Sequence, residues 1–194
     1  MSTVGTPPAT TVRYLIDAKG STFNVRAFAT GVLSVFGHSP TIAIPDFQGE
    51  VRWSSSALED ASLRLVIQAA SLKVTDDISD KDRREMESKM HGEVLETDGY
   101  SEIVYECPRV SSVQRIADGL FSVALNGELS LHGVTLNQPV SARVTLSADT
   151  LHATGEFSVR QTDYDIKPVS AAGGTVKLKD ELKLSFNIAA RKQS

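Results

Sequence analysis

The chain has 194 residues, of which 41% are hydrophobic and 23% are charged, and its formal net charge is -4. These proportions exclude a disordered or collagen-like chain and are typical of a soluble globular protein. Acidic and basic residues are interspersed and form no basic stripe for phosphates, which argues against a nucleic-acid partner. Cys107 is the only cysteine, so no intramolecular disulfide can form, and we expect its side chain to pack as a small apolar residue.

One domain is expected over residues 12–194, preceded by a flexible tail over residues 1–11. The chain length suits a single all-β domain. The first residues carry neither a positive start nor an apolar core, so they do not resemble a secretory signal. No run approaches the roughly 20 apolar residues of a membrane-spanning helix. We therefore expect no integral membrane segment and a soluble, cytoplasmic protein.

Alternation of apolar and polar residues dominates the chain and predicts strands with one buried face. Residues 14–27 alternate on both sides of Lys19 and Gly20, which are typical turn residues, so this stretch predicts an opening hairpin. Residues 62–68 predict a half-buried strand.

One segment breaks this period and predicts a surface helix. Residues 79–95 are rich in charge and place Met86 and Met90 four residues apart on one stripe. Ser79 is a suitable N-cap. A glycine in mid-helix costs about 1 kcal/mol relative to alanine, so we expect the helix to fray or stop near Gly92.

The second half of the chain returns to the strand period. Residues 120–131 predict one long strand, or two strands bent at a glycine. Residues 140–146 and 151–159 share one parity across a short turn and predict a hairpin. Residues 176–178 and 182–190 predict a closing hairpin in the same way.

Many long strands and one helix leave two architectures, a two-sheet sandwich and a closed barrel. A sandwich fills its interior with side chains, whereas a barrel of about eight strands keeps room for one small ligand, as lipocalins do. Small residues at inward positions favour such a cavity. They are Gly127, Ala142, Ala153, Gly155 and Ala190.

Signatures of catalysis are absent from the sequence. It contains no Gly-x-Ser-x-Gly, His-Glu-x-x-His, phosphate loop or dinucleotide fingerprint. His38, His91, His132 and His152 are scattered singly, without the spacing of metal ligands on one element. We therefore predict no catalytic residue, no metal site and no cofactor.

Short motifs follow one another along nearly the whole chain. A Y-x-I-D and S-x-F-x-V opening is formed by Tyr14, Ile16, Asp17, Ser21, Phe23 and Val25. Phe47 and Gly49 follow, and then a charged helix with an aromatic strand, formed by KDRREMESKM, Val94, Leu95, Tyr100, Ile103 and Tyr105. The later motifs are formed by Gly127, Leu129, His132, Gly133, Val134 and Thr135, by Arg160, Asp163, Tyr164 and Ile166, and by Asp180 and Leu182. In this order they resemble the YceI-like family of polyisoprenoid-binding proteins.

The resemblance implies an all-β fold, namely an extended eight-stranded antiparallel lipocalin-like β-barrel with one surface helix. It also implies a bacterial, non-enzymatic protein that binds, and carries or sequesters, an isoprenoid or fatty-acid-like amphiphile in the barrel interior. Members of the family are often periplasmic or secreted, whereas a chain without a visible signal is expected in the cytoplasm.

The predicted ligand-binding residues combine inward apolar side chains with polar groups for the ligand's head. Arg160 or His38 would pair with the head group at the barrel mouth. The alternatives are an ion pair with Asp163 or a neighbour for Arg160 and a structural role in a turn for His38. The two helix methionines would form an adaptable lid or dock the helix on the barrel. The full predicted set is Phe23, Val25, Leu63, Leu65, Ile67, Met86, Met90, Leu125, Leu129, Phe157, Arg160, Tyr164, Phe186 and His38.

Two other functions remain open at this point. An enzyme acting on a lipid-like substrate in the same cavity would use His38 or His132 as acid or base and needs a converging polar cluster. An interaction protein would have a completely packed interior. Self-association through a strand edge or a barrel end, giving a homodimer, is a further expectation.

Overall fold

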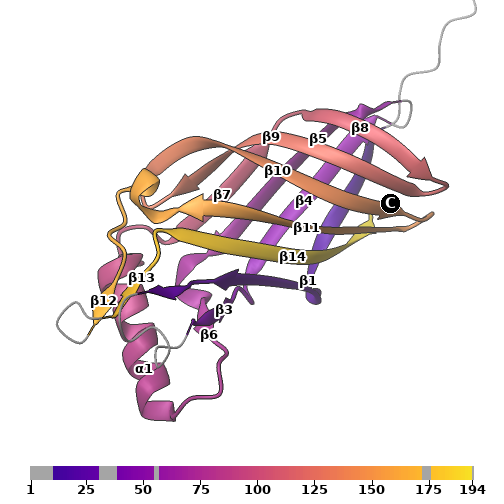
Figure 1. Cartoon of the computed structure of the whole chain (residues 1–194). Helices are drawn as coiled ribbons and strands as arrows, with labels where there is room; N and C mark the ends of the chain where they lie inside the picture. Colours follow the sequence, from indigo (N-terminus) through magenta and orange to yellow (C-terminus); the bar gives the residue numbers. More distant parts are fainter. Residues whose placement is uncertain (1–10, 31–38, 55–56, 172–175, 194) are drawn as a thin grey trace, which may run out of the picture.

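The computed structural model of the chain describes residues 11–30, 39–54, 57–171 and 176–193. Eight long antiparallel strands form a closed barrel (Figure 1). The last strand pairs with the first, so the barrel wall has no open seam between them. Around the wall the strands follow in the order β1 (Thr11–Arg26), β4 (Phe47–Ser54), β5 (Ala57–Gln68), β7 (Glu102–Cys107), β9 (Leu120–Leu131), β10 (Val134–Leu146), β11 (Thr150–Arg160) and β14 (Glu181–Lys192).

The predicted alternation gives the barrel wall its two faces. In β11, Leu151 and Val159 lie on the same face of the strand and are buried, whereas His152 lies on the opposite face and is exposed. Neighbouring strands are in register, so that inward residues such as Phe157 and Leu184 stand opposite each other. β10 and β11 form the predicted hairpin, and β9 is one long strand. Burial of these inward faces, worth about 25 cal/mol per Å² of apolar surface, is the main force that holds the barrel.

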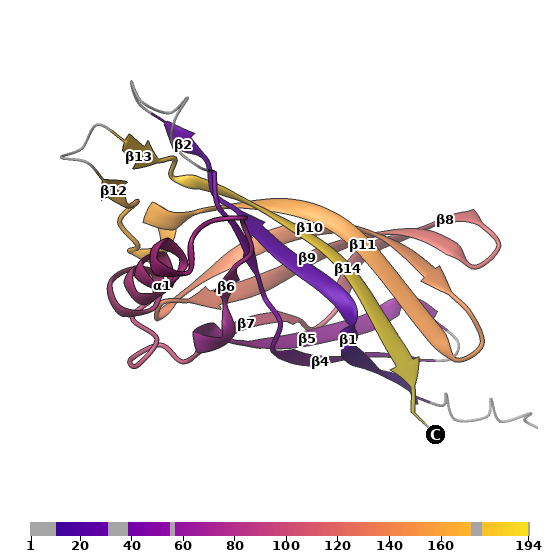
Figure 2. The ribbon, with the colours of Figure 1, turned by 90° about the horizontal axis from the view of Figure 1, so that it is seen from below.

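Shorter elements cover the ends of the barrel. The single α-helix of the described residues lies at one end, and the turn between β10 and β11 lies at the other (Figures 1 and 2). Two short strands continue the sheet beside β1, one strand pairs with β9, and three form a separate small sheet. These are β3 (Thr41–Ala43) and β6 (Lys73–Val74), β8 (Val110–Ala117), and β2 (Ala29–Thr30), β12 (Ser170–Ala171) and β13 (Val176–Leu178). Short 3-10 turns lie at Ala69–Ser71 and Gln161–Tyr164.

The predicted opening hairpin is wrong. β1 is a single strand of 16 residues, and both of its halves pair with β14. The residues around Gly20 form a bulge, in which the Ser21 hydroxyl donates to the Asp17 carbonyl at 2.6 Å and accepts from the Ala189 N–H at 2.9 Å. Because polar groups of the bulge form hydrogen bonds within the bulge and with β14, β1 can hold the extra residues and continue along the same partner without reversing direction.

The predicted closing hairpin is also wrong. β13 does not pair with β14 but lies between β12 and β2 in the small sheet. Leu178 stands opposite Ala29, and the Lys179 N–H donates to the Phe28 carbonyl at 2.8 Å. The backbone of β13 therefore forms its hydrogen bonds with residues near the N-terminus. β14 begins at Glu181 and pairs with β11 instead.

The predicted helix is present but shorter than expected. α1 spans Asp80–Lys89, and its N-cap is Ser79, as predicted, whose hydroxyl accepts the Asp82 N–H at 3.1 Å. The chain then makes one π turn at Met90–Val94, and Gly92 lies in this turn. No helix of the described residues is long and apolar enough to cross a membrane.

Two inward glycines make room for aromatic rings. A Cβ atom on Gly127 would lie 2.6 Å from Cζ of Tyr105, and one on Gly155 would lie 2.5 Å from Cζ of Phe186. The expectation that these glycines leave cavity space is therefore wrong, because Tyr105 and Phe186 occupy that space.

We expect Gly155→Ala to lower the free energy of unfolding by about 1–3 kcal/mol, the usual cost of an overpacked interior. The new methyl group would press on the Phe186 ring and on the Ser141 carbonyl oxygen, which lies 2.5 Å from its position. Urea unfolding measures the change. Gly92→Ala is the matched control, because nothing lies within 4 Å of its Cβ position, and it should leave stability unchanged or higher. Equal stability of Gly155→Ala and the natural protein would contradict this packing.

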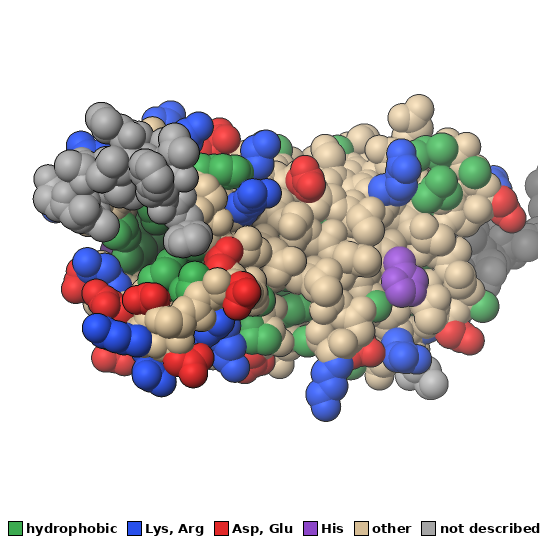
Figure 3. Space-filling view, turned by 60° about the horizontal axis from the view of Figure 1, so that its bottom comes forward, with side chains coloured by type: hydrophobic (Ala, Val, Ile, Leu, Met, Phe, Trp, Pro, Cys, Tyr) green, Lys and Arg blue, Asp and Glu red, His purple; other side chains and the backbone are tan. Residues whose placement is uncertain are grey.

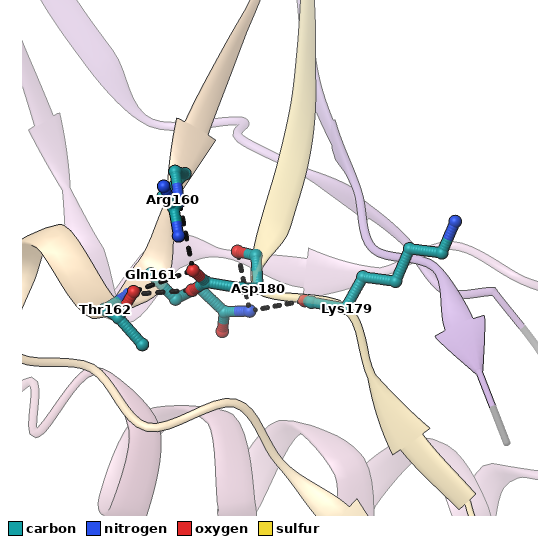
Figure 4. Close-up of polar contacts among 5 residues, drawn as sticks. All are labelled: Arg160, Gln161, Thr162, Lys179 and Asp180. Atoms are coloured by element: carbon teal, nitrogen blue, oxygen red, sulfur yellow. Dashed lines mark hydrogen bonds and ion pairs between the residues drawn. The ribbon is translucent and has the colours of Figure 1, made fainter.

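The Asp180 carboxylate fixes the end of β11 to the start of β14 (Figure 4). It accepts the Thr162 backbone N–H at 2.8 Å and the Thr162 hydroxyl at 2.7 Å, and it pairs with Arg160 at 3.2 Å. These contacts, those with Thr162 foremost, hold the pKa of Asp180 below its ordinary value of 3.8. The ion pair of Arg160 is therefore formed with Asp180 rather than with Asp163.

A lowered pKa means that Asp180 stabilises the fold while it is ionised. Between its folded-state pKa and the ordinary value, the unfolded chain binds more protons, so this contribution is lost as the pH falls through that window. We expect Asp180→Asn to show a shallower loss of stability than the natural protein below about pH 4, measured by urea unfolding across a pH series. Asp163→Asn removes a charge from the same turn and is the matched control. Identical pH slopes in the two variants would argue against the role of Asp180.

Candidate functional site

A long apolar cavity of about 360 Å³ occupies the barrel interior. This volume falls within the roughly 300–1,000 Å³ typical of small-molecule sites. All eight barrel strands contribute to its lining, together with α1 and the π turn that follows it. Trp53 and Leu151 line the end near the turn between β10 and β11, and Met86 and Met90 line the end beneath α1. The cavity is therefore elongated along the barrel, and apolar side chains line it from one end to the other.

Most of the predicted ligand-binding residues line this cavity. Of the predicted residues that the structure describes, all except Arg160 and Tyr164 belong to the lining. His38 lies outside the described residues. The small residues Ala142, Ala153 and Ala190 line the cavity as well. The predicted residues that the structure brings together are Phe23, Val25, Leu63, Leu65, Ile67, Met86, Met90, Leu125, Leu129, Phe157 and Phe186.

Arg160 and Tyr164 lie apart from the cavity lining. Arg160 is exposed on the outer face of β11, since Val159 before it and Gln161 after it are buried. Tyr164 is 2% exposed, and burial, with a smaller effect of the Asp163 charge, raises the pKa of its phenol. A contact of either side chain with a ligand would require a rearrangement of this turn.

The helix α1 covers one end of the cavity as a lid held by polar contacts. Glu87 accepts the Val74 N–H of β6 at 2.9 Å, and Arg83 donates to the Val74 carbonyl. Because these contacts dock the helix, Met86 and Met90 remain directed to the cavity. In Figure 3 hydrophobic side chains reach the surface at this end, beside the charged side chains of the lid. The two roles considered for the methionines are compatible, because Met90 packs in the buried core and also lines the cavity.

Among the described residues, few with polar side chains line the cavity. They are Ser62, Lys89, Tyr105 and Gln161. The Tyr105 hydroxyl is fully engaged, because it donates to the Gln138 carbonyl and accepts the Gly127 N–H, both at 3.1 Å. Burial raises the pKa of Tyr105 to about 12, so the phenol stays neutral at physiological pH. This hydroxyl joins strands of the wall and is not a free group for chemistry.

Gln161 is the buried polar residue of the site and was missed by the sequence analysis. It is 4% exposed and follows β11 directly. Its Nε2 donates to the carbonyls of Lys179 and Asp180 at 2.9 and 3.3 Å (Figure 4). A signal was present in the sequence, because position 161 continues the inward parity of Phe157 and Val159.

The described histidines lie outside the cavity lining. His91, His132 and His152 are all absent from it. His132 instead contacts Glu96 through Nε2 at 2.8 Å and the Tyr164 carbonyl through Nδ1 at 3.2 Å. Within the described ranges, no three His, Cys, Asp or Glu side chains come together to hold a metal ion. The described part of the cavity thus offers a surface for binding and no acid–base cluster.

Solved structures share this barrel over most of its length. A polyisoprenoid binding domain from Saccharophagus degradans, implicated in plant cell wall breakdown, has a TM-score of 0.67 and 17% identity, covering 93% of this chain and 98% of that domain. BcnA of Burkholderia cenocepacia has a TM-score of 0.66 and 14% identity, with coverages of 90% and 98%. A YceI protein of Campylobacter jejuni has a TM-score of 0.57 and 13% identity, with coverages of 79% and 85%. At these identities the likeness shows the fold.

The family follows from the sequence itself. No curated protein sequence matches the chain. The family model of the YceI-like domain matches residues 14–190, a range that reaches into every strand of the barrel. The predicted resemblance is therefore confirmed, and the chain belongs to the YceI-like family.

Proposed function

We propose that this protein binds a long-chain amphiphile of the isoprenoid or fatty type in the barrel interior and carries or sequesters it. The observation that supports this most directly is the continuous apolar lining of the cavity, contributed by every strand of the barrel. The name of the domain from Saccharophagus degradans, a polyisoprenoid binding domain with the same fold, is consistent with such a ligand.

The physical basis is the transfer of a hydrocarbon chain out of water. Each methylene buried against an apolar wall contributes about 0.8 kcal/mol. Inward residues such as Leu125, Phe157 and Phe186 provide that wall. A ligand with many methylenes therefore binds tightly with few polar contacts, and the affinity depends on chain length more than on the head group.

The two competing functions find less support. A packed interaction module needs an interior filled with side chains, and the barrel interior holds a cavity of about 360 Å³. An enzyme needs groups that transfer protons near the substrate. The described histidines lie outside the cavity lining, and the Tyr105 hydroxyl is engaged with the backbone.

We expect the affinity for unbranched alcohols to rise about fourfold per added methylene until the cavity is filled, which is the equivalent of about 0.8 kcal/mol per methylene. Native mass spectrometry of the purified chain, titrated with alcohols of increasing length, measures the series. The same spectra, followed by organic extraction, identify any lipid that copurifies. Absence of both a copurifying lipid and saturable binding at every chain length would overturn the carrier function.

Filling the cavity should block the ligand. Ala153 lines the cavity on the inward face of β11, whereas the neighbouring Thr154 is exposed. We expect Ala153→Phe to weaken binding of a long-chain alcohol at least tenfold, because the ring occupies space that the chain needs. Thr154→Phe is the matched control and should bind as the natural protein does. Equal losses in both variants would show that the effect comes from the fold and not from the cavity.

A further inference from the structure

The position of Gln161 gives the cavity a polar end. Among the polar lining residues, Lys89 is exposed at the C-terminal end of α1, and the Tyr105 hydroxyl is already engaged. Gln161 is 4% exposed and is one of the residues that line the cavity. It lies after β11, at the end of the barrel that α1 covers.

The orientation of the Gln161 amide is set by its neighbours. Nε2 lies 2.9 Å from the Lys179 carbonyl oxygen and 3.3 Å from the Asp180 carbonyl oxygen. Only the NH₂ group can face two acceptors, so the amide cannot be turned round. The backbone N–H of Gln161 donates to the Asp180 carbonyl at 3.0 Å, which holds the residue in place. Oε1 therefore points away from the β14 turn, toward the side on which α1 lies (Figure 4).

In the described part of the chain no donor contacts this oxygen, and it is not among the fully enclosed side-chain atoms that lack a partner. An amide oxygen beside an apolar cavity meets little water and gains stability from any donor that reaches it. Resting on the proposed function, we propose that Gln161 Oε1 accepts a hydrogen bond from a hydroxyl group at the end of the bound chain. The preferred ligand is then a neutral long-chain alcohol, such as a prenol or a fatty alcohol.

An anionic head group does not fit the same place. A carboxylate has no proton to donate to Oε1, and carboxylate and phosphate alike would present negative oxygens to it. The charge would also be buried among apolar residues, because Lys89, the only cation of the described lining, is exposed at the rim. The hydroxyl end therefore lies beneath α1, and the hydrocarbon tail extends toward Trp53 and Leu151.

Competition between ligands of equal chain length tests this assignment. Hexadecanol, hexadecyl methyl ether and hexadecanoate are mixed pairwise with the full chain at neutral pH, and native mass spectrometry compares the adducts. We expect the natural protein to bind the alcohol about tenfold more tightly than the ether, the effect of one hydrogen bond to a buried acceptor. Hexadecanoate should bind more weakly than the alcohol as well.

A variant of Gln161 and a matched control separate a contact with the ligand from an effect on the fold. Gln161→Met keeps the size of the side chain and removes the acceptor, so the alcohol and the ether should then bind equally. Thr162→Ala loosens the same turn by removing the hydroxyl that donates to Asp180, and the tenfold preference should persist. If Gln161→Met fails to fold, the comparison of the three ligands on the natural protein still decides the proposal.

The outcomes distinguish this proposal from the proposed function. Saturable but equal binding of alcohol and ether by the natural protein would overturn the role of Gln161 and leave the carrier function standing. Tighter binding of hexadecanoate than of hexadecanol would also overturn it and would point to Lys89 at the rim. Failure of all three ligands to bind would overturn both proposals. Loss of the preference in Thr162→Ala as well as in Gln161→Met would show that Gln161 acts through the turn.

Discussion

The pairing of β1 with β14 is the interaction on which the cavity depends. It joins the first strand of the described chain to the last, and so turns a sheet with two edges into a closed wall. Closure satisfies the backbone groups that an open edge would leave unpaired. It also surrounds the inward apolar face on all sides, so that this face needs no second sheet to cover it. The bulge around Gly20 keeps both halves of β1 on the same partner, and the closure spans nearly the whole length of the barrel.

One end of this wall is covered by a lid that polar side chains hold in place and that two methionines line. Arg83 and Glu87 hold α1 to the backbone of β6, and Met86 and Met90 face the cavity. Methionine side chains are flexible and adapt to irregular apolar shapes. A lid of this kind can contact apolar ligands of different shape without changing the polar contacts that position it, as the proposed function requires.

The junction of β11 and β14, beside this lid, contains residues that stabilise the barrel and a residue that lines the cavity. Asp180 holds Thr162 and Arg160 on the outside of the wall, and the carbonyls of Lys179 and Asp180 hold the amide of Gln161 on the inside. The same few residues therefore fix the junction of β11 and β14 and, in the proposed complex, hold the acceptor that meets the ligand's hydroxyl. An apolar wall supplies affinity without direction, and in the proposed complex this oxygen would give the ligand its orientation.

The sequence by itself determined the family, the all-β class, the inward faces of the strands and the capped helix. The inward faces and the capped helix depend on alternation and capping, which are local properties of the chain. The family follows from short motifs in a fixed order along the chain. Only the tertiary structure decided the bulge at Gly20, the partner of β13, the filling of the space at Gly155 by an aromatic ring, and the carbonyl groups that hold the Gln161 amide. Turn residues permit a reversal but do not require one, and a small residue leaves space that any neighbour can fill. Whether the chain reverses, and which side chain fills the space, depends on strands and side chains that are distant in sequence. These take up their positions only when the barrel closes.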